Sequence, residues 1–477
     1  MSKESLLIKN TIIVTMGKIC TQLISFFLLP LYTALLTTDE YGVVDLLNTI
    51  ISLLVPIIVL QLDQGVFRYL IDCRGKDDEQ NKLITSTAYF VLAQICIYCL
   101  LFFVFSPFLH NEYKYFLLYN LIASLLVTVL MQISRGMGDN FTYSIGSFIA
   151  GSLTIILNVL FIVQFNMGAN GMLLASLISN AVCALYFFSK LGIFKRINKK
   201  LYDFDILKDM LHYSIPLVPN TVSWWIVSAS NRVIISFFLN LSANGIFSAA
   251  NKFSGIITTI YGIFNLTWTE SASLNIHSTD RDKFFSKIFD SVLRIFGSIC
   301  LNVFTLMPIV FPIMLNENYI DAYDQIPILM IATLFNIIVS FYGSIYVANK
   351  LTKEIAKTSI MSAVINLSFN CIFIHFLGLF AASLATAISY LLIFIYRYFD
   401  SKKYVCLKIN KKISLSMVTI YIISLALYYI DNNFLNTFMI GIGLIYALLV
   451  NVKFVKSILT IIKKILKQKI LLNSRRA

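Results

Sequence analysis

Long apolar runs, separated by short polar segments, recur along the whole chain. The first run covers residues 11–36, an acidic turn follows at residues 37–41, and a second apolar run begins at once. A run of about 17–25 mainly apolar residues is long enough to cross the hydrocarbon core of a bilayer as a helix. The first two runs therefore predict a transmembrane hairpin.

The same pattern predicts about fourteen membrane spans in all. Their expected positions are residues 11–36, 43–62, 84–106, 115–134, 142–164, 171–189, 213–238, 244–267, 288–315, 325–347, 358–376, 379–396, 413–430 and 435–451. Hydrophobic residues make up 58% of the chain and charged residues 13%, and the mean hydropathy is +0.80. This composition excludes a soluble domain, so we expect an all-α polytopic membrane protein.

A basic stretch divides the predicted spans into two sets of six. It contains the sequence KRINKKLYDFDILKDML, whose helical spacing is typical of an amphipathic segment on a membrane surface. The predicted organisation is an N-lobe at residues 1–189, a cytoplasmic amphipathic linker at 190–211, a C-lobe at 212–398, and spans 13 and 14 with a basic cytoplasmic tail at 399–477.

Two segments recur in the second half of the chain. GANGMLLASLIS, at Gly168–Ser179, matches GLFAASLATAIS, at Gly378–Ser389, with an offset of 210 residues. Tyr41-Gly42-Val43 with Asn48 matches Asn244-Gly245-Ile246 with Asn251, at an offset of 203. Both copies open even-numbered spans, so the repeats run in the same direction through the membrane. Parallel repeats predict two six-helix lobes around a central cavity, an architecture more typical of a transporter than of an enzyme.

The positions of the basic residues indicate the orientation in the membrane. Of 38 Lys and Arg residues, only Lys114 falls in the loops on the side opposite the termini, and four lie within predicted spans (Lys18, Arg232, Lys252 and Arg294). The others share the side of the termini, which the positive-inside rule assigns to the cytoplasm. We therefore expect a cytoplasmic membrane protein with both termini inside. The net charge of +14 is distributed over short loops, which argues against a nucleic-acid partner.

Polar side chains accompany the cations inside the predicted spans. Lys18 shares a helix face with Gln22, and Lys252 follows Asn251. Arg232 has Asn231 and Trp224 at neighbouring helical positions. Together with Asn48, these residues are the candidate substrate-binding set, because a hydrated cavity with fixed cations suits an anionic ligand. The alternative for each cation is a side chain that extends toward the membrane surface. Asp45 is interpreted first as a solvated helix terminus and second as a residue that couples a cation.

No pattern of metal ligands, no disulfide framework and no catalytic residue set is apparent in the sequence. The cysteines lie mainly inside apolar runs, the four histidines lack ligand spacing, and no Gly-rich nucleotide-binding loop is present. We therefore expect no cofactor and no direct use of ATP. A Na⁺ or H⁺ gradient and the downhill removal of product both stay open as energy sources.

The sequence PLYTALLTTDEYGVVDLLNTI, from Pro30 to Ile50, resembles the first hairpin of the bacterial polysaccharide-repeat flippases, and the resemblance continues over Ile215–Lys252. These flippases belong to the multidrug/oligosaccharidyl-lipid/polysaccharide exporter superfamily. The resemblance implies two six-helix lobes with two further helices. It also implies movement of undecaprenyl-pyrophosphate-linked oligosaccharide to the outer leaflet, for O-antigen, lipopolysaccharide or capsule synthesis. Implied partners are the lipid-linked oligosaccharide, membrane lipids, a polysaccharide polymerase and a chain-length regulator.

Two other functions are compatible with the pattern of spans. A multidrug or toxin extruder would bind cationic compounds and would favour buried carboxylates, whereas the charges within these spans are mainly positive. A membrane glycan polymerase or ligase would need a long external loop or an aqueous domain to hold its acceptor, and the predicted external loops are short. We therefore expect a flippase and not an enzyme.

Overall fold

The computed structural model describes residues 26–108, 112–349, 351–430 and 432–452. Within these ranges the chain forms helices and no strand. Ten of the described helices are long and apolar enough to cross a membrane, and a shorter apolar helix covers Phe434–Val450. The predicted class, an all-α polytopic membrane protein, is confirmed.

Each predicted span after the first coincides with one or two helices. They are α3 (Thr38–Ile58), α5 (Asp77–Phe105), α6 (Lys114–Gly136), α7 (Asn140–Val159) continued by η2 (Leu160–Gln164), α8 (Gly168–Lys190), α11 (Leu217–Phe238), α12 (Leu241–Asn275), α13 (Arg281–Thr305) with α14 (Met307–Met314), α15 (Asp321–Ala348), α16 (Thr352–Leu377), α17 (Leu379–Ser401), α18 (Lys411–Ile430) and α19 (Asn433–Val450). Of the first predicted span, only the part from residue 26 onward is described, and it contains α2 (Leu29–Leu35).

Two predicted spans are interrupted in the structure. The span expected at residues 43–62 ends at Ile58, because Leu60 and Gln61 adopt left-handed backbone angles (φ 53° and 55°) just after Pro56, and a separate helix, α4 (Leu62–Asp72), follows. The span expected at 288–315 breaks at Leu306, before Pro308. At the second break Pro308 cannot donate a helical hydrogen bond, so the change of direction there has a local cause.

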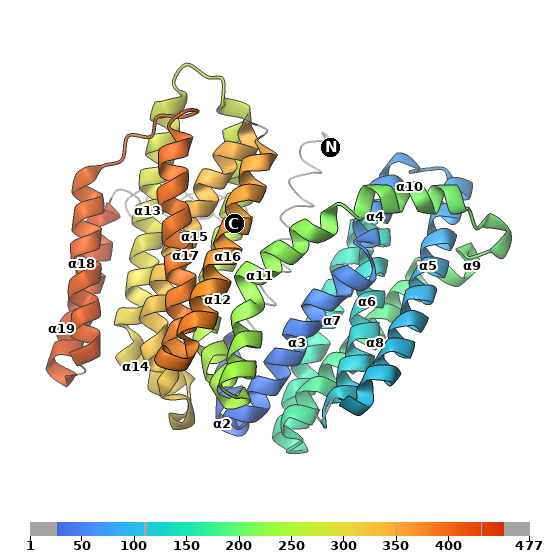
Figure 1. The fold of residues 1–477 in the computed structure, drawn as a ribbon, viewed down its shortest axis with the longest axis horizontal. Coiled ribbons are helices and arrows are strands. Elements are labelled where there is room, and N and C mark those ends of the chain that lie inside the picture. Colours follow the sequence, from blue (N-terminus) through green and yellow to red (C-terminus); the bar gives the residue numbers. More distant parts are fainter. Residues whose placement is uncertain (1–25, 109–111, 350, 431, 453–477) are drawn as a thin grey trace, which may run out of the picture. The chain divides into compact units, whose positions relative to one another are not determined.

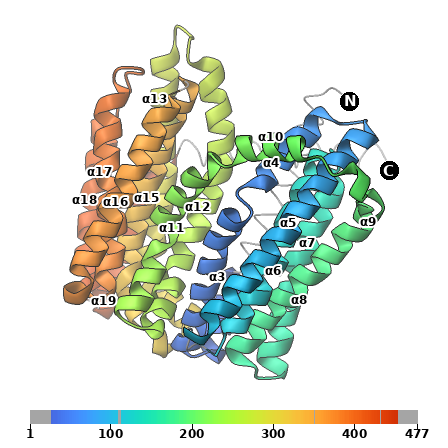
Figure 2. The ribbon, with the colours of Figure 1, turned by 45° about the vertical axis from the view of Figure 1, so that its right-hand side comes forward.

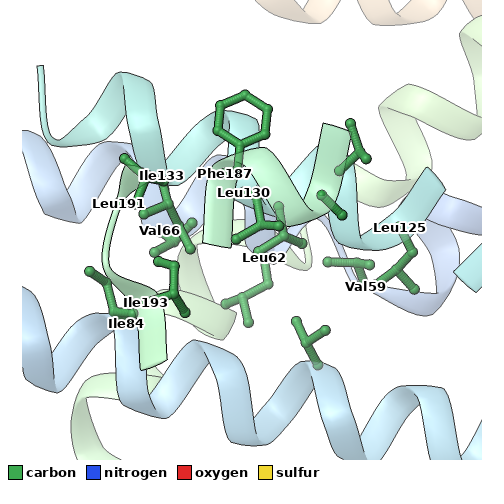
Figure 3. Packing of buried hydrophobic residues seen from close by; sticks show 14 of the residues in the cluster. Val59, Leu62, Val66, Ile84, Leu125, Leu130, Ile133, Phe187, Leu191 and Ile193 are labelled. Atoms are coloured by element: carbon green, nitrogen blue, oxygen red, sulfur yellow. The ribbon is translucent and has the colours of Figure 1, made fainter. Parts of the chain in front are cut away.

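The chain divides into two compact units. The first comprises residues within Met1–Lys252, Met314–Ala322 and Ala356–Ala385. In it, α5 to α8 run side by side and α10 (Phe204–Ser214) lies across one end of them (Figures 1 and 2). The core of this bundle is a cluster of apolar residues that includes Leu62, Leu130 and Phe187, all at most 3% exposed (Figure 3).

The second unit comprises residues within Phe253–Ile313, Tyr323–Ile355 and Thr386–Ala477. Its interior is rich in aromatic side chains. Trp268 stacks on Phe341 with ring centroids 4.5 Å apart, and Tyr323 stacks on Tyr428 at 4.4 Å. Such offset ring pairs add to the free energy gained from burying the apolar area. The division of the chain into lobes at the linker, expected from the sequence, stays a prediction.

The linker expected at residues 190–211 is partly helical. It contains α9 (Ile193–Arg196), the short helix η3 (Lys199–Leu201) and α10, which extends three residues beyond the predicted end. Asp203 caps α10, since its carboxylate accepts hydrogen bonds from the backbone N–H groups of Asp205 and Ile206. The amphipathic pattern is therefore realised as a set of short helices and not as one continuous helix.

Candidate functional site

The candidate site is built from α3, α11 and the first part of α12, all within the first unit. Arg232 on α11 forms an ion pair with Asp45 on α3, with 2.8 Å between Nε and Oδ2. The same carboxylate oxygen accepts a hydrogen bond from Ser248 Oγ on α12, at 2.6 Å. One carboxylate thus joins α3 to α11 and α12, two consecutive helices that are far from α3 in the sequence.

Lys252 adds a second cation to this group. It follows Ser248 by four residues on α12, so the two side chains share a helix face. Asp45 and Arg232 both act on Lys252 electrostatically, but in the described part of the chain no carboxylate lies within 4.0 Å of its amine. The cluster therefore carries two positive charges against one negative charge.

The backbones of α3 and α12 approach each other closely beside the ion pair. A Cβ on Gly42 would overlap the carbonyl group of Leu241, and a Cβ on Gly245 would overlap that of Thr38. Asn244 Nδ2 donates to the carbonyl of Gly42 at 2.9 Å. Only glycine permits this separation, so these two residues determine how near Ser248 comes to Asp45.

The contact also relates the two sequence repeats. Gly42 and Gly245 are separated by the repeat offset of 203 residues, and so are Asp45 and Ser248. Each residue packs against its own repeat equivalent, as expected where two copies of one element meet about a pseudo-two-fold axis. The weaker of the two repeats read from the sequence therefore coincides with a direct contact in the structure.

The α3 segment after Asp45 is held by a tryptophan from α11. Trp225 Nε1 donates to the backbone carbonyl of Thr49 at 3.1 Å and to Ser52 Oγ at 3.0 Å. The sequence had indicated its neighbour Trp224, which is 46% exposed. Both positions are consistent with the helical pattern of α11, and the pattern alone does not show which ring turns toward α3.

A second polar group lies next to Arg232. Asn231 is 7% exposed, donates to the carbonyl of Ala382 at 3.2 Å and accepts a hydrogen bond from Asn370 Nδ2 at 3.0 Å. Asn370 ends a column on α16 whose members, spaced by four residues, are at most 4% exposed: Thr358, Ser362, Asn366 and Asn370. In the described structure, neither amide atom of Asn366 has a hydrogen-bond partner. This column was missed from the sequence, although its i, i+4 spacing inside an apolar span is a readable signal.

The other predicted site residues are less closely associated. Asn48 is exposed on α3 and Asn251 is half-buried on α12, and the described side chains show no hydrogen bond from either to Arg232 or Asp45. Lys18 and Gln22 lie outside the described residues. Of the nine predicted residues, the structure brings together Asp45, Asn231, Arg232 and Lys252.

One interpretation of Asp45 was wrong. Asp45 lies two turns inside α3, with its side chain 18% exposed and paired, so it is not a solvated helix terminus. Asp45 also supplies Arg232 with a counter-ion from the protein itself. In the ranges that the structure covers, no group of three His, Cys, Asp or Glu side chains could hold a metal ion.

Comparison with known proteins adds a family match. A family model described as "Polysaccharide biosynthesis protein" matches residues 7–269. No curated protein sequence gives a significant match. The family model covers more than half of the chain, including α3, α11 and most of α12.

Solved structures with the same fold include two kinds of transporter. A structure of the lipid II flippase MurJ in an inward closed conformation aligns with a TM-score of 0.68 and 18% identity, over 95% of this chain and 100% of that chain. An inward-facing multidrug resistance MATE family transporter of the MOP superfamily aligns with a TM-score of 0.67 and 14% identity, over 80% of this chain and 95% of that chain. At these identities the likeness concerns the fold.

Proposed function

We propose that this chain, which belongs to the polysaccharide biosynthesis protein family, is a flippase for lipid-linked oligosaccharides. Its substrate would be an undecaprenyl-pyrophosphate-linked repeat unit, moved from the cytoplasmic to the outer leaflet by alternating access. The product would serve surface polysaccharide synthesis of the O-antigen or capsule type. The observation that carries the proposal is the cluster of Arg232, Lys252 and Asp45, which has one positive charge in excess.

The charge of the cluster suits an anionic ligand. A cation in a membrane span is costly to bury unless water or a counter-ion is present. Asp45 balances Arg232, and Lys252 is left for a ligand anion. The guanidinium of Arg232 can bind two phosphate oxygens at once, whereas Lys252 acts as a point charge. A diphosphate would therefore compete with Asp45 for Arg232 while pairing with Lys252.

This competition suggests how binding changes the protein. Asp45 holds α3 to α11 through Arg232 and to α12 through Ser248. A diphosphate that takes Arg232 leaves Asp45 with the single hydrogen bond from Ser248. The contact between the two repeats is then weakened in the state that has substrate bound, and a ligand changes a conformational equilibrium in this way when it binds one state better than the other.

Three parts of the proposal rest on the sequence and on the family resemblance. The distribution of Lys and Arg supports an inner-membrane location with both termini cytoplasmic. The resemblance implies a polymerase and a chain-length regulator as partners. A Na⁺ or H⁺ gradient and the downhill removal of product both stay open as the energy source. Lys18 and Gln22, from the first span, complete the proposed binding set.

The test measures lipid-linked glycan in cells that depend on this protein for export. We expect Arg232→Ala to abolish export, Arg232→Lys to retain part of it, and Lys252→Ala or Lys18→Ala to weaken it, with normal protein levels in the membrane. Lys114→Ala, at the start of α6, is the control and should export normally. Wild-type export by both Arg232→Glu and Lys252→Glu would show that the cluster does not bind the substrate.

A second candidate is a cation-coupled multidrug extruder, which the fold shared with the MATE transporter favours. In that case Asp45 would bind the coupling ion or a cationic drug. The ion pair with Arg232 weighs against this role, because the carboxylate is already neutralised. Accumulation of cationic dyes in cells with and without the protein separates the two candidates, since only an extruder would lower dye content.

A further inference from the structure

An apolar cavity of about 170 Å³ lies in the first unit, between α5, α6 and the linker that follows α8. Its lining includes Val91 of α5, Leu130 of α6 and Ile197 of the linker. Leu92 and Phe194, which also line it, are 56% and 73% exposed. The cavity therefore opens on the outer surface of the bundle, which faces lipid in a membrane.

The linker is fixed across the polar end of this cavity by two neighbouring hydroxyls of α5. Thr85 Oγ1 donates to the carbonyl of Arg196 and accepts from the N–H of Asn198, both at 3.3 Å. Ser86 Oγ donates to the carbonyl of Asp203 at 3.1 Å and accepts from its N–H at 3.0 Å. Each hydroxyl thus satisfies a donor and an acceptor of the linker backbone, and the position of the linker on α5 is well defined.

The fixed linker presents positive charge next to the cavity. Lys195, Lys199 and Lys200 are exposed, and no carboxylate lies within 4.0 Å of their amines in the described ranges. Arg196 is used differently, since it donates to Asn81 at 3.0 Å and lies 3.6 Å from Asp77. The three lysines are therefore available to an external anion.

Aromatic side chains of the linker also contact aromatic side chains of α5 and α8. Phe194 stacks on Phe188 with ring centroids 5.1 Å apart, and Tyr202 contacts Tyr89 edge-on at 5.7 Å. Both Tyr202 and Tyr89 are exposed, at 42% and 38%. Exposed tyrosines beside lysines are typical of the interface between lipid tails and headgroups.

We propose that this cavity binds an acyl chain of an anionic glycerophospholipid from the leaflet that the linker faces. The phosphate lies among Lys195, Lys199 and Lys200, and the acyl chain lies against the apolar lining of the cavity. Four of the residues that line the cavity, Ile84, Leu130, Ile133 and Ile193, come together in Figure 3. The site does not depend on the transported substrate, because none of its residues belongs to the Asp45–Arg232 cluster.

The test uses the full-length protein in detergent, with bound lipid counted by native mass spectrometry. Phosphatidylglycerol is compared with phosphatidylcholine that has the same acyl chains. We expect wild type to retain phosphatidylglycerol at least about tenfold better, and K195Q/K199Q/K200Q to lose that preference. K283Q/K287Q/K353Q, which removes the same charge from exposed lysines of the second unit, should keep it.

One further variant tests the cavity apart from the charge. Ala88→Phe fills the cavity and should lower retention of both lipids. Equal losses in the two triple variants would overturn the proposal, because they would indicate general surface charge. Retention of undecaprenyl phosphate but not of phosphatidylglycerol would also overturn it.

Discussion

Gly42 and Gly245, equivalent positions in the two sequence repeats, pack against each other where α3 meets α12. An ideal Cβ built on Gly245 lies 3.0 Å from the backbone nitrogen of Gly42, and one built on Gly42 lies 3.0 Å from the nitrogen of Gly245. The contact is reciprocal, and it places Asp45 beside Ser248, each three residues further along its helix. The closest approach of the repeats and the charged cluster are therefore one structural feature.

Gly42→Ala and Gly245→Ala should each destabilise the protein by about 1–3 kcal/mol, because the added methyl overlaps a backbone carbonyl that cannot move alone. The measurement is the melting temperature of the purified protein in detergent. Gly262→Ala is the matched control on the same α12, since no atom lies within 4 Å of its Cβ position. Helix propensity predicts that this control is neutral or stabilising by up to about 1 kcal/mol.

The Asp45–Arg232 pair should show energetic coupling. Asp45→Asn leaves Arg232 with an unbalanced charge, and Arg232→Gln leaves Asp45 unbalanced, so each single variant should lower the melting temperature. The double variant should be more stable than the sum of the two losses predicts, by about 0.5–3 kcal/mol. Strictly additive losses would mean that the two side chains do not stabilise each other.

Asn366 should separate stability from transport. Its amide lies fully buried with no hydrogen bond in the described structure, which is costly unless water or an ion is bound there. We expect Asn366→Leu to leave the melting temperature unchanged or raised while it lowers glycan export. Val364→Leu, at an exposed position on the same helix, is the control and should leave both unchanged. A loss of stability with normal export would assign Asn366 to packing.

Asp63 should make the stability depend on pH. Asp63 on α4 is 5% exposed, and burial raises its pKa above the ordinary value of 3.8. A 2.7 Å hydrogen bond from Gln64 partly opposes this rise in pKa. An acid whose folded-state pKa is raised stabilises the fold most at low pH, and that stability is lost as the pH rises through the folded-state pKa.

Asp63→Asn should therefore stabilise the protein at pH 7 relative to wild type, and the difference should shrink toward pH 4. Melting temperatures measured across this range provide the comparison. Asp72→Asn, on the same helix, is the control: its side chain is 63% exposed in a surface pair with Arg68, so the effect should be small at every pH.

The predicted topology can be tested by reporter fusions. Fusions at Asp39, Glu112 and Asn318 should report the outside, and fusions at Lys76, Lys199, Lys403 and the C-terminus should report the cytoplasm. The short helix Glu317–Tyr319 lies between α14 and α15, so a fusion at Asn318 reports the side of the membrane on which the ninth predicted span ends. A cytoplasmic signal there would contradict the arrangement of fourteen spans.

The sequence by itself determined the elements of this fold. The length and periodicity of the apolar runs locate the membrane helices, because a span must satisfy its own backbone hydrogen bonds in lipid. Each described span is therefore visible in the sequence as an apolar run. The breaks at Leu60–Gln61 and at Leu306 shifted span ends but not the number of spans, because each break is local. The repeat that relates Gly42 to Gly245 was also readable, and so was the presence of Arg232 and Lys252 within spans.

Only the tertiary structure decided which of these residues meet. A helix face can be predicted from spacing, but its partner depends on packing between segments about 200 residues apart. For that reason Asp45 was expected to be solvated and is instead paired with Arg232. Trp225, which the sequence did not single out, donates a hydrogen bond to α3. The polar spacing of the column that ends at Asn370 is readable in the sequence, but its contact with Asn231 appears only once α16 is placed.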